Sequence, residues 1–301
     1  MLSVGARSDL REGIARRPTT APPQVLFVGS AVFHYLGPAF AVLLFARVEP
    51  LGVAWLRIAS AAAVFALWRR PWRAFAAAER ADRETVVYLA VVFAAMNACF
   101  YLAIERLPLG TVAAIEFLPV IALAAVGART PRNAVALALA VSGVYLLTDV
   151  RLEGEAVGLA FAFANAALFA FYIVLAHRLA RSRRLSRLDG LAAAMLVAAI
   201  VVTPVAGRSA APAFADPVAV AAGIGVGLSS SVIPYVSDQL AMARLSRATY
   251  SLMVALLPAT ATVVGIVVLA QIPTAIELTG VVLVALAVAA HRERRPEPQR
   301  G

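Results

Sequence analysis

The stretch MNACFYLAIERLPLGTVAAIEFLPVIAL, residues 96 to 123, decides the fold. A short turn joins two apolar segments in it, and the second segment carries an acid, Glu116, three residues before Pro119. A carboxylate is costly to bury in an apolar run, and inside a membrane such a residue is a functional-site hypothesis by default. The stretch therefore predicts both a membrane environment and a place to look for function.

The composition of the whole chain agrees with a membrane protein. Of its 301 residues, 62% are hydrophobic and 15% are charged, whereas soluble domains have roughly 45–50% apolar and about 25% charged residues. The net charge of +10 does not indicate nucleic-acid binding, because the arginines lie between apolar runs rather than on a folded basic surface. A single cysteine, Cys99, excludes a disulfide framework and a cysteine-based metal site.

Ten apolar runs follow an Arg-rich and Pro-rich start. A helix needs about 20 residues to cross ~30 Å of hydrocarbon, and runs rich in Ala, Leu and Val without alternation favour helices over a barrel. The sequence therefore predicts an all-α polytopic membrane protein with ten transmembrane helices. The runs are 24–45, 51–68, 85–104, 109–127, 133–149, 156–177, 190–206, 217–243, 248–270 and 275–291.

The arginines predict the orientation, because short basic loops stay on the cytoplasmic side. With the N-terminus inside, 22 arginines fall in the inner segments, four fall in the outer segments, and Arg57 lies within a span. We therefore expect a protein of the inner or plasma membrane with both termini in the cytoplasm.

The chain also contains an internal repeat. Residues 102–111 read LAIERLPLGT and residues 240–249 read LAMARLSRAT, and each is followed by an apolar run with one proline. Five spans per copy would invert one copy relative to the other, which is the architecture of secondary transporters. The predicted organisation is a tail (1–23), a first repeat (24–149), an outer linker (150–155), a second repeat (156–291) and a tail (292–301). The alternative is a chance match between Ala/Leu-rich segments.

Four prolines lie within predicted spans one, four, eight and nine. Because proline lacks the N–H that would bond four residues back, each frees a carbonyl, and at membrane depth this is tolerated only against protein or a water-filled cavity. We expect these spans to share an interior cavity, although each kink has a plain packing interpretation. The prolines are Pro38, Pro119, Pro234 and Pro258, and the freed carbonyls belong to His34, Ile115, Ser230 and Val254.

Glu116 and Arg57 are the charged residues placed deepest in the predicted spans. Glu116 lies seven residues into its span, roughly 10 Å deep at ~1.5 Å per residue. One interpretation is a buried structural ion pair between the two. The functional hypothesis is that Glu116 binds a substrate ammonium or a proton, while Arg57 holds a carboxylate.

Further polar residues are candidates for a substrate path, although such groups often only join helices. Asp238 lies near the inner end of span eight, and His34 has a side chain that titrates near neutrality. The uncharged candidates are Tyr35, Asn97, Tyr172, Asn165 and Ser229 to Ser231. No H-E-x-x-H, G-x-S-x-G or metal-ligand cluster is present, so we expect neither an enzyme nor a cofactor.

The residues MNACFYLAIERLPLGTVAAIEF, IPYVSDQLAMARL and LLPA resemble the EamA family of the drug/metabolite transporter superfamily, in its threonine/homoserine exporter type. The resemblance covers residues 24–291 and implies two inverted five-helix bundles and proton-driven export of small metabolites. In this resemblance, Asn97, Glu116, Asp238 and Arg57 match polar positions of the family pattern. Where the family often has acids, this chain has Leu257 and Gln271, which leaves Glu116 as the only deeply placed acid.

The function predicted from these observations is export of amino acids or similar small metabolites by proton antiport, with alternating access. Glu116 would exchange protons with the substrate, and the partners would be the substrate, protons and the lipid bilayer. The alternatives are an exporter of purine metabolites or cationic drugs, and a membrane scaffold or sensor that transports nothing.

Overall fold

The computed structural model describes residues 23–119, 121–122, 130–149, 155–179, 182, 185–234, 237 and 257–290. Every regular element in these ranges is a helix, so the all-α class is confirmed. The second copy of the repeated turn, residues 240–249, and Asp238 lie outside the described residues.

A helix lies within each of the predicted apolar runs. They are α2 (Pro23–Leu44), α3 (Pro50–Arg69), α5 (Arg80–Ile104), α6 (Leu109–Glu116), α8 (Pro131–Asp149), α9 (Ala156–Leu179), α10 (Arg187–Ala210), α11 (Pro217–Gly227), α14 (Leu257–Leu269) and α15 (Ala275–Ala290). Three short elements accompany them: α4 (Pro71–Ala77), a 3-10 helix η1 (Ala211–Ala215) and a π-helix η2 (Leu228–Val232). Among the described helices, α3, α5, α9 and the segment 188–215 are long and apolar enough to cross a membrane. The count of ten spans stays a prediction.

Prolines and polar caps set several helix starts. Pro50, Pro131 and Pro217 begin α3, α8 and α11, at the position where a missing N–H removes no helical hydrogen bond. Asp216 caps α11 by accepting a hydrogen bond from the Val218 N–H at 2.9 Å. Its pKa is held below the usual range, first by the hydrogen bond from Arg47 and then by such backbone N–H groups.

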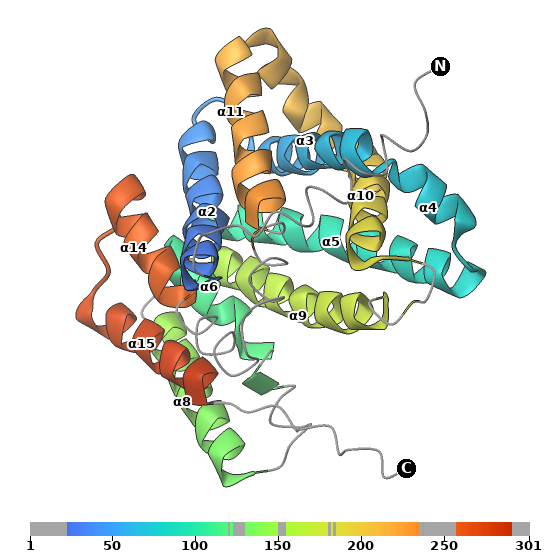
Figure 1. The fold of residues 1–301 in the computed structure, drawn as a ribbon. Coiled ribbons are helices and arrows are strands. Elements are labelled where there is room, and N and C mark those ends of the chain that lie inside the picture. Colours follow the sequence, from blue (N-terminus) through green and yellow to red (C-terminus); the bar gives the residue numbers. More distant parts are fainter. Residues whose placement is uncertain are drawn as a thin grey trace, which may run out of the picture.

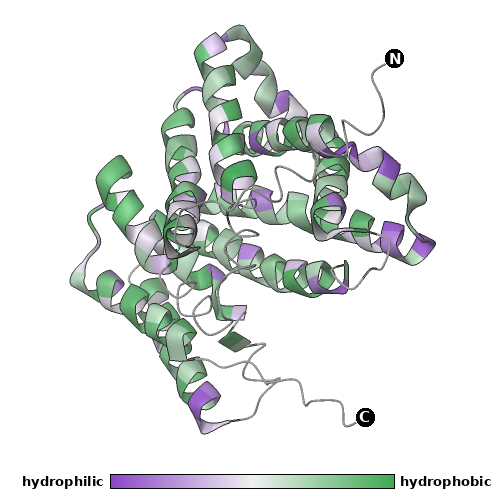
Figure 2. Cartoon of the chain, viewed as in Figure 1, coloured by the Kyte–Doolittle hydropathy of each residue, from purple (hydrophilic) through white to green (hydrophobic). Residues whose placement is uncertain are grey.

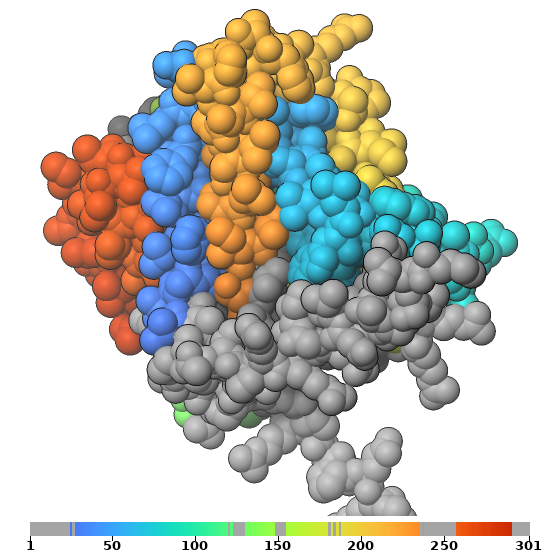
Figure 3. Space-filling model, turned by 45° about the horizontal axis from the view of Figure 1, so that its top comes forward, coloured from blue at the N-terminus to red at the C-terminus, as the bar shows by residue number. Residues whose placement is uncertain are grey.

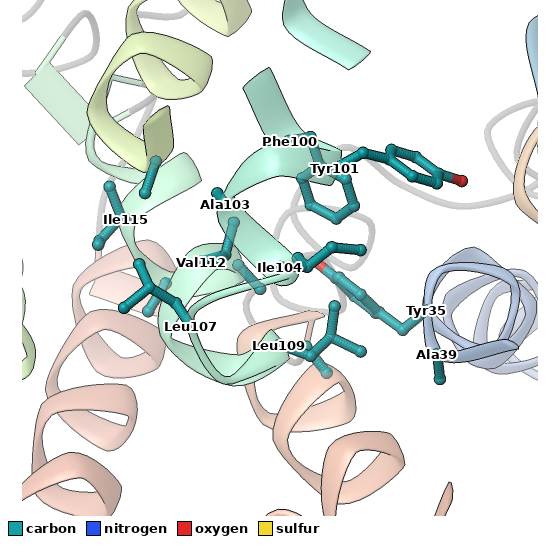
Figure 4. Packing of buried hydrophobic residues seen from close by; sticks show 14 of the residues in the cluster. Tyr35, Ala39, Phe100, Tyr101, Ala103, Ile104, Leu107, Leu109, Val112 and Ile115 are labelled. Carbon is teal, nitrogen blue, oxygen red and sulfur yellow. The ribbon is translucent and has the colours of Figure 1, made fainter. Parts of the chain in front are cut away.

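The helices pack in neighbouring pairs around a buried centre. α2 contacts α14 and α11, α3 contacts α10, α5 contacts α9, and α8 contacts α15 (Figure 1). The space-filling view shows α2 lying between α14 and α11 along one face (Figure 3). Buried side chains from α2, α5 and α6 meet at the centre, where Tyr35 points from α2 toward Ile104 of α5 (Figure 4).

The outward faces of the helices are apolar. Most residues of the helices are hydrophobic, and many of the hydrophilic residues lie toward helix ends and turns (Figure 2). Leu67, Val205 and Val267 are each more than 70% exposed (84%, 72% and 76%). An apolar surface of this extent is unfavourable in water, and a bilayer accepts it, because lipid-facing helices satisfy their own backbone hydrogen bonds.

The turn after α14 contains a strained residue. Ala270 has a positive φ of 53°, the left-handed conformation common just after a helix C-terminus, and the N–H of Gln271 donates to the carbonyl of Gly265 at 3.1 Å. Glycine usually occupies this position, because a Cβ in the left-handed region costs roughly 1–2 kcal/mol.

We therefore expect Ala270→Gly to stabilise the protein by about 0.5–1 kcal/mol, after allowing for the greater freedom of glycine in the unfolded chain. Thermal or denaturant unfolding in detergent measures this difference. Ala160→Gly in the middle of α9, where the residue is exposed, serves as a control of opposite sign, because glycine in a helix destabilises by about 1 kcal/mol. Equal destabilisation by both substitutions would contradict the assignment of strain to Ala270.

Candidate functional site

Arg57 lies at the centre of a buried polar cluster. It projects from α3 and is only 7% exposed. Its Nε donates a hydrogen bond to the Ser231 Oγ at 3.2 Å, and its Nη2 donates to the Ser230 carbonyl at 3.3 Å. Because both serines lie in η2, the arginine joins α3 to η2.

The local sequence of η2 explains why this carbonyl is open to Arg57. Pro234 lies four residues after Ser230 and has no N–H, so it cannot supply the α-helical donor to that oxygen. The chain there takes the wider π geometry over Leu228–Val232, which is often found at functional sites. The carbonyl predicted to be freed by Pro234 is thus the acceptor that Arg57 uses.

Tyr101 adds a third side to the cluster. The guanidinium carbon of Arg57 lies 5.8 Å from the centre of the Tyr101 ring, in cation–π range. Tyr101 is fully buried on α5. Its hydroxyl interacts with Arg57 and with Ser230, but neither this hydroxyl nor the Oγ of Ser230 makes a hydrogen bond of good geometry among the described residues.

Glu116 ends α6 and faces α9. The Nδ2 of Asn165 donates to its Oε1 at 3.3 Å, and Asn165 is completely buried. The Oδ1 of Asn165 has no partner in the part of the chain that the structure describes. Asn165 was expected only as a candidate for a polar path, and it proves to be the direct partner of the central acid.

Arg57 and Glu116 do not form the direct ion pair that was one interpretation of the sequence. No ion pair of either residue occurs among the described residues. They remain electrostatic neighbours within the same buried region. Among the described residues, the hydrogen-bond partners of both charged groups are neutral.

His34 and Tyr35 extend the cluster on α2. Their rings meet edge to face with centroids 5.2 Å apart, and Tyr35 is 1% exposed. His34 interacts electrostatically with Arg57, and Tyr35 with Glu116. These two predicted residues thus lie in the region shared by the two charges.

Two other predicted residues have different surroundings. Asn97 is buried, and its Nδ2 donates to the Phe93 carbonyl of its own helix at 2.8 Å. Tyr172 stacks against Phe169, with centroids 6.1 Å apart, and also contacts Phe93. No contact described here joins them to Arg57 or Glu116, and Asp238 lies outside the described residues.

The other predicted prolines lie within helices or next to a helix end. Pro38 is within α2, and Pro119 follows the end of α6. Pro258 is the second residue of α14, where its carbonyl accepts a hydrogen bond from the Thr262 Oγ1 at 3.0 Å. Val254, whose carbonyl Pro258 would free, lies outside the described residues. Pro204 inside α10 is a further helical proline that the sequence analysis did not consider.

Tyr101 is the site residue that the sequence analysis missed. It lies four residues after Asn97 in the opening stretch, one helical turn along the same face. That spacing from a predicted polar residue was the available signal.

A separate pocket of about 220 Å³ lies where α6, α14 and α15 meet. It is lined by Pro108, Gly110, Thr111, Thr262, Gln271, Ile272, Pro273, Glu277 and Val281. The Oε1 of Gln271 accepts a hydrogen bond from the Leu109 N–H at 3.1 Å, which caps the start of α6. None of the predicted binding residues lines this pocket, so it is distinct from the Arg57 cluster.

Gly37 lets α2 approach η2 closely. A Cβ on Gly37 would lie 1.9 Å from the Ser230 Oγ and 3.0 Å from the Ser230 Cβ, whereas a Cβ on Gly29 of the same helix would meet nothing within 4 Å. We expect Gly37→Ala to displace Ser230 and lower stability by about 1 kcal/mol, at the lower end of overpacking costs. Gly29→Ala is the matched control, and unfolding in detergent is the measurement. Equal stability of the two variants would contradict this packing.

Comparison with known proteins places the chain among transporters. Residues 156–290 match the EamA-like transporter family. The chain is 29% identical over 268 residues to the threonine/homoserine exporter RhtA of Escherichia coli strain K12, covering 88% of this chain and 89% of that protein. It is 28% identical over 286 residues to the threonine/homoserine exporter RhtA of Salmonella typhimurium strain LT2, covering 94% and 95%.

A solved crystal structure superimposes on the chain with a TM-score of 0.58 at 17% identity, covering 89% of this chain and 95% of the other. This likeness shows a shared fold. The resemblance to the EamA family is supported by this match: residues 156–290 are similar to a family of transporters rather than enzymes, and most of the chain is similar to threonine/homoserine exporters.

Proposed function

We propose that this protein is a secondary exporter of amino acids similar to threonine and homoserine, driven by proton antiport. The coarser statement, a membrane exporter of small metabolites, follows from the family and from relatives aligned over most of the chain. The observation that carries the finer proposal is Glu116, whose only described hydrogen-bond partner is the neutral Asn165. An acid held this way at membrane depth can take up and release a proton.

The helix contacts support two inverted repeats. α3 contacts α10, α6 contacts α14, and α8 contacts α15. In the predicted order these are spans two and seven, four and nine, and five and ten, each pair five spans apart. A pseudo-twofold axis between repeats produces such contacts, because it brings each element on the axis against its own copy.

Contacts between helices that do not lie on that axis also occur twice, once for each way of exchanging the two predicted repeats. α5 contacts α9, and the corresponding contact of α11 with α2 is present. α2 contacts α14, and the corresponding contact of α9 with α6 is present. The family match over residues 156–290 covers almost the same residues as the second predicted repeat, which supports the same division.

Contacts between turns support the alternation of the predicted spans. Arg47 pairs with Asp216 at 2.6 Å, and both lie in turns predicted outside. Arg69 pairs with Asp189 at 2.8 Å, and both lie in segments predicted inside. A wrong span would bring predicted inner and outer residues together, so these pairs favour the predicted topology, with both termini in the cytoplasm of a plasma or inner membrane.

The proposed mechanism places the substrate between the repeats. Arg57 and η2 belong to spans two and eight, whereas Glu116 and Asn165 belong to spans four and six. Rocking of one repeat against the other would expose these groups to each side in turn, as in other transporters built from inverted repeats. Release of a proton from Glu116 would leave a carboxylate for the substrate ammonium, so that each binds when the other has left.

Substrate counterflow in proteoliposomes tests this function. We expect vesicles preloaded with homoserine to take up labelled threonine or homoserine, faster than vesicles lacking the protein. The panel also contains a purine nucleoside and a cationic dye. Counterflow of one of these solutes without counterflow of an amino acid would show that the protein exports that solute class instead. Absence of counterflow for every solute would contradict a transport function.

A further inference from the structure

We propose that Arg57, Tyr101 and Ser230 form a subsite for the carboxylate of the substrate. The proposal rests on the proposed function and deepens it: the transported molecules must carry a free carboxylate beside the amino group. The three residues come from α3, α5 and η2, and each is buried.

The first argument is the unbalanced charge of Arg57. The side chain is 7% exposed and makes two hydrogen bonds, both to neutral oxygens of η2. No carboxylate pairs with it among the described residues. Guanidinium has five N–H donors in a planar fork that matches a carboxylate, so among the described residues some donors remain beyond the bonds to Ser230 and Ser231 and the contact with Tyr101. A buried charge left in this state is strongly unfavourable unless an anion joins it.

The second argument is independent of charge. The hydroxyl of Tyr101 and the Oγ of Ser230 are buried and interact with each other, and the Tyr101 hydroxyl interacts with Arg57. Neither oxygen makes a hydrogen bond of good geometry in the described part of the chain, and a poorly satisfied buried hydroxyl is costly. Tyr101 packs its ring against the Arg57 guanidinium, and Arg57 bonds the backbone of Ser230 itself. The unused donors are therefore gathered around one guanidinium, where a carboxylate would satisfy all of them.

The third argument is that the site is held in shape without a ligand. Glycines allow close backbone approach on both sides of η2: a Cβ on Gly227 would lie 2.8 Å from the Arg57 carbonyl, and one on Gly37 would strike Ser230. The Oγ of Ser231 accepts from the Arg57 Nε, which fixes the guanidinium plane. Such fixed donors need little reordering on binding, and this favours affinity.

The chemistry of the ligand follows from the two charged groups, Glu116 and Arg57. Glu116, partnered only by Asn165, presents a carboxylate for an ammonium group, and the Arg57 subsite presents donors for a carboxylate. A small amino acid with both groups free fits this pair of sites. An amide, ester or lactone of the same molecule keeps the ammonium and lacks the carboxylate.

The test measures binding and transport separately. Purified protein in detergent is titrated with L-threonine and with L-threoninamide, and thermal stabilisation gives apparent dissociation constants. We expect threonine to bind the parent at least ~10-fold more tightly than threoninamide, as expected for loss of a charge-assisted hydrogen-bonded pair. The same comparison is made with homoserine and its lactone.

Two substitutions test the residues. Arg57→Gln should weaken threonine binding roughly 10- to 100-fold and leave threoninamide binding unchanged, because only the carboxylate contact is lost. Tyr101→Phe keeps the ring and should weaken threonine binding about 3- to 10-fold; it also serves if Arg57→Gln does not fold. The control for Arg57→Gln is Arg80→Gln, and the control for Tyr101→Phe is Tyr88→Phe. Arg80 and Tyr88 are exposed residues of α5, so both controls should bind threonine like the parent.

Counterflow of threonine separates the two proposals. Normal counterflow together with equal binding of threonine and threoninamide would overturn the carboxylate subsite and leave the exporter function standing. No counterflow of any amino acid, together with carboxylate-dependent binding that Arg57→Gln abolishes, would retain the subsite and overturn the proposed transport. Equal weakening of both ligands by Arg57→Gln would also overturn the subsite, because it would indicate a general packing role.

Discussion

Glu116→Gln is expected to abolish export driven by a proton gradient while leaving exchange of amino acid for amino acid measurable. The substitution keeps the size of the side chain and an oxygen to accept the hydrogen bond from Asn165, but it cannot take up or release a proton at membrane depth. In proteoliposomes, uptake driven by a pH gradient should fall to the level of empty vesicles.

The matched control for this prediction is Glu105→Gln. Glu105 lies in the turn between α5 and α6 and is exposed, so this substitution removes an acid from the same stretch without touching the buried centre. It should transport like the parent. Gradient-driven uptake that survives Glu116→Gln would contradict the assignment of the coupling proton to Glu116.

Gly280→Ala is expected to cause a large loss of stability. A Cβ on Gly280 would lie 2.8 Å from the Gly143 carbonyl oxygen, and a Cβ on Gly143 would lie 2.6 Å from the Gly280 carbonyl oxygen. Both obstacles are backbone atoms, so α8 and α15 would have to separate. Overpacking of this kind costs about 1–3 kcal/mol, and close small-residue contacts are a main source of helix association in membranes.

Unfolding in detergent and the yield of folded protein measure the effect of Gly280→Ala. Gly225→Ala is the control, because a Cβ there would meet nothing within 4 Å and alanine favours the helix. Gly143→Ala should resemble Gly280→Ala, since the two glycines form one contact. A Gly280→Ala protein as stable as the Gly225→Ala protein would show that the α8 and α15 backbones do not pack as closely as described.

The sequence predicted the helices well because each one lies in a long apolar run, which is a strong signal for a membrane helix. Apolar runs of spanning length can only be helices when the polar turns between them are short, and the observed starts of α3 and α9, Pro50 and Ala156, fall within one residue of prediction. The predictions were weaker where helices end or change type. η2 lies within a predicted apolar run and contains Ser229 to Ser231. These serines make the run locally polar, but polarity alone does not distinguish a π-helix from an α-helix.

The candidate site was predicted in part for a related reason. Glu116 and Arg57 stand out because charge is rare in apolar runs, and the carbonyl freed by Pro234 is the acceptor that Arg57 uses. Tyr101 is a common packing residue, and only its tertiary neighbours reveal a role. Asn165 was a candidate for the polar path, but its contact with Glu116 depends on tertiary structure. Asn97 shows the converse, because a polar side chain on a buried face can bond its own helix.

The most direct test of the account records proton movement during export. Proteoliposomes containing a trapped pH-sensitive dye receive homoserine on one side, with the membrane potential clamped. The account predicts proton flux opposite to homoserine flux in the parent and none above background in the Glu116→Gln protein. Homoserine transport by the parent without proton flux, or equal proton flux in both proteins, would contradict it.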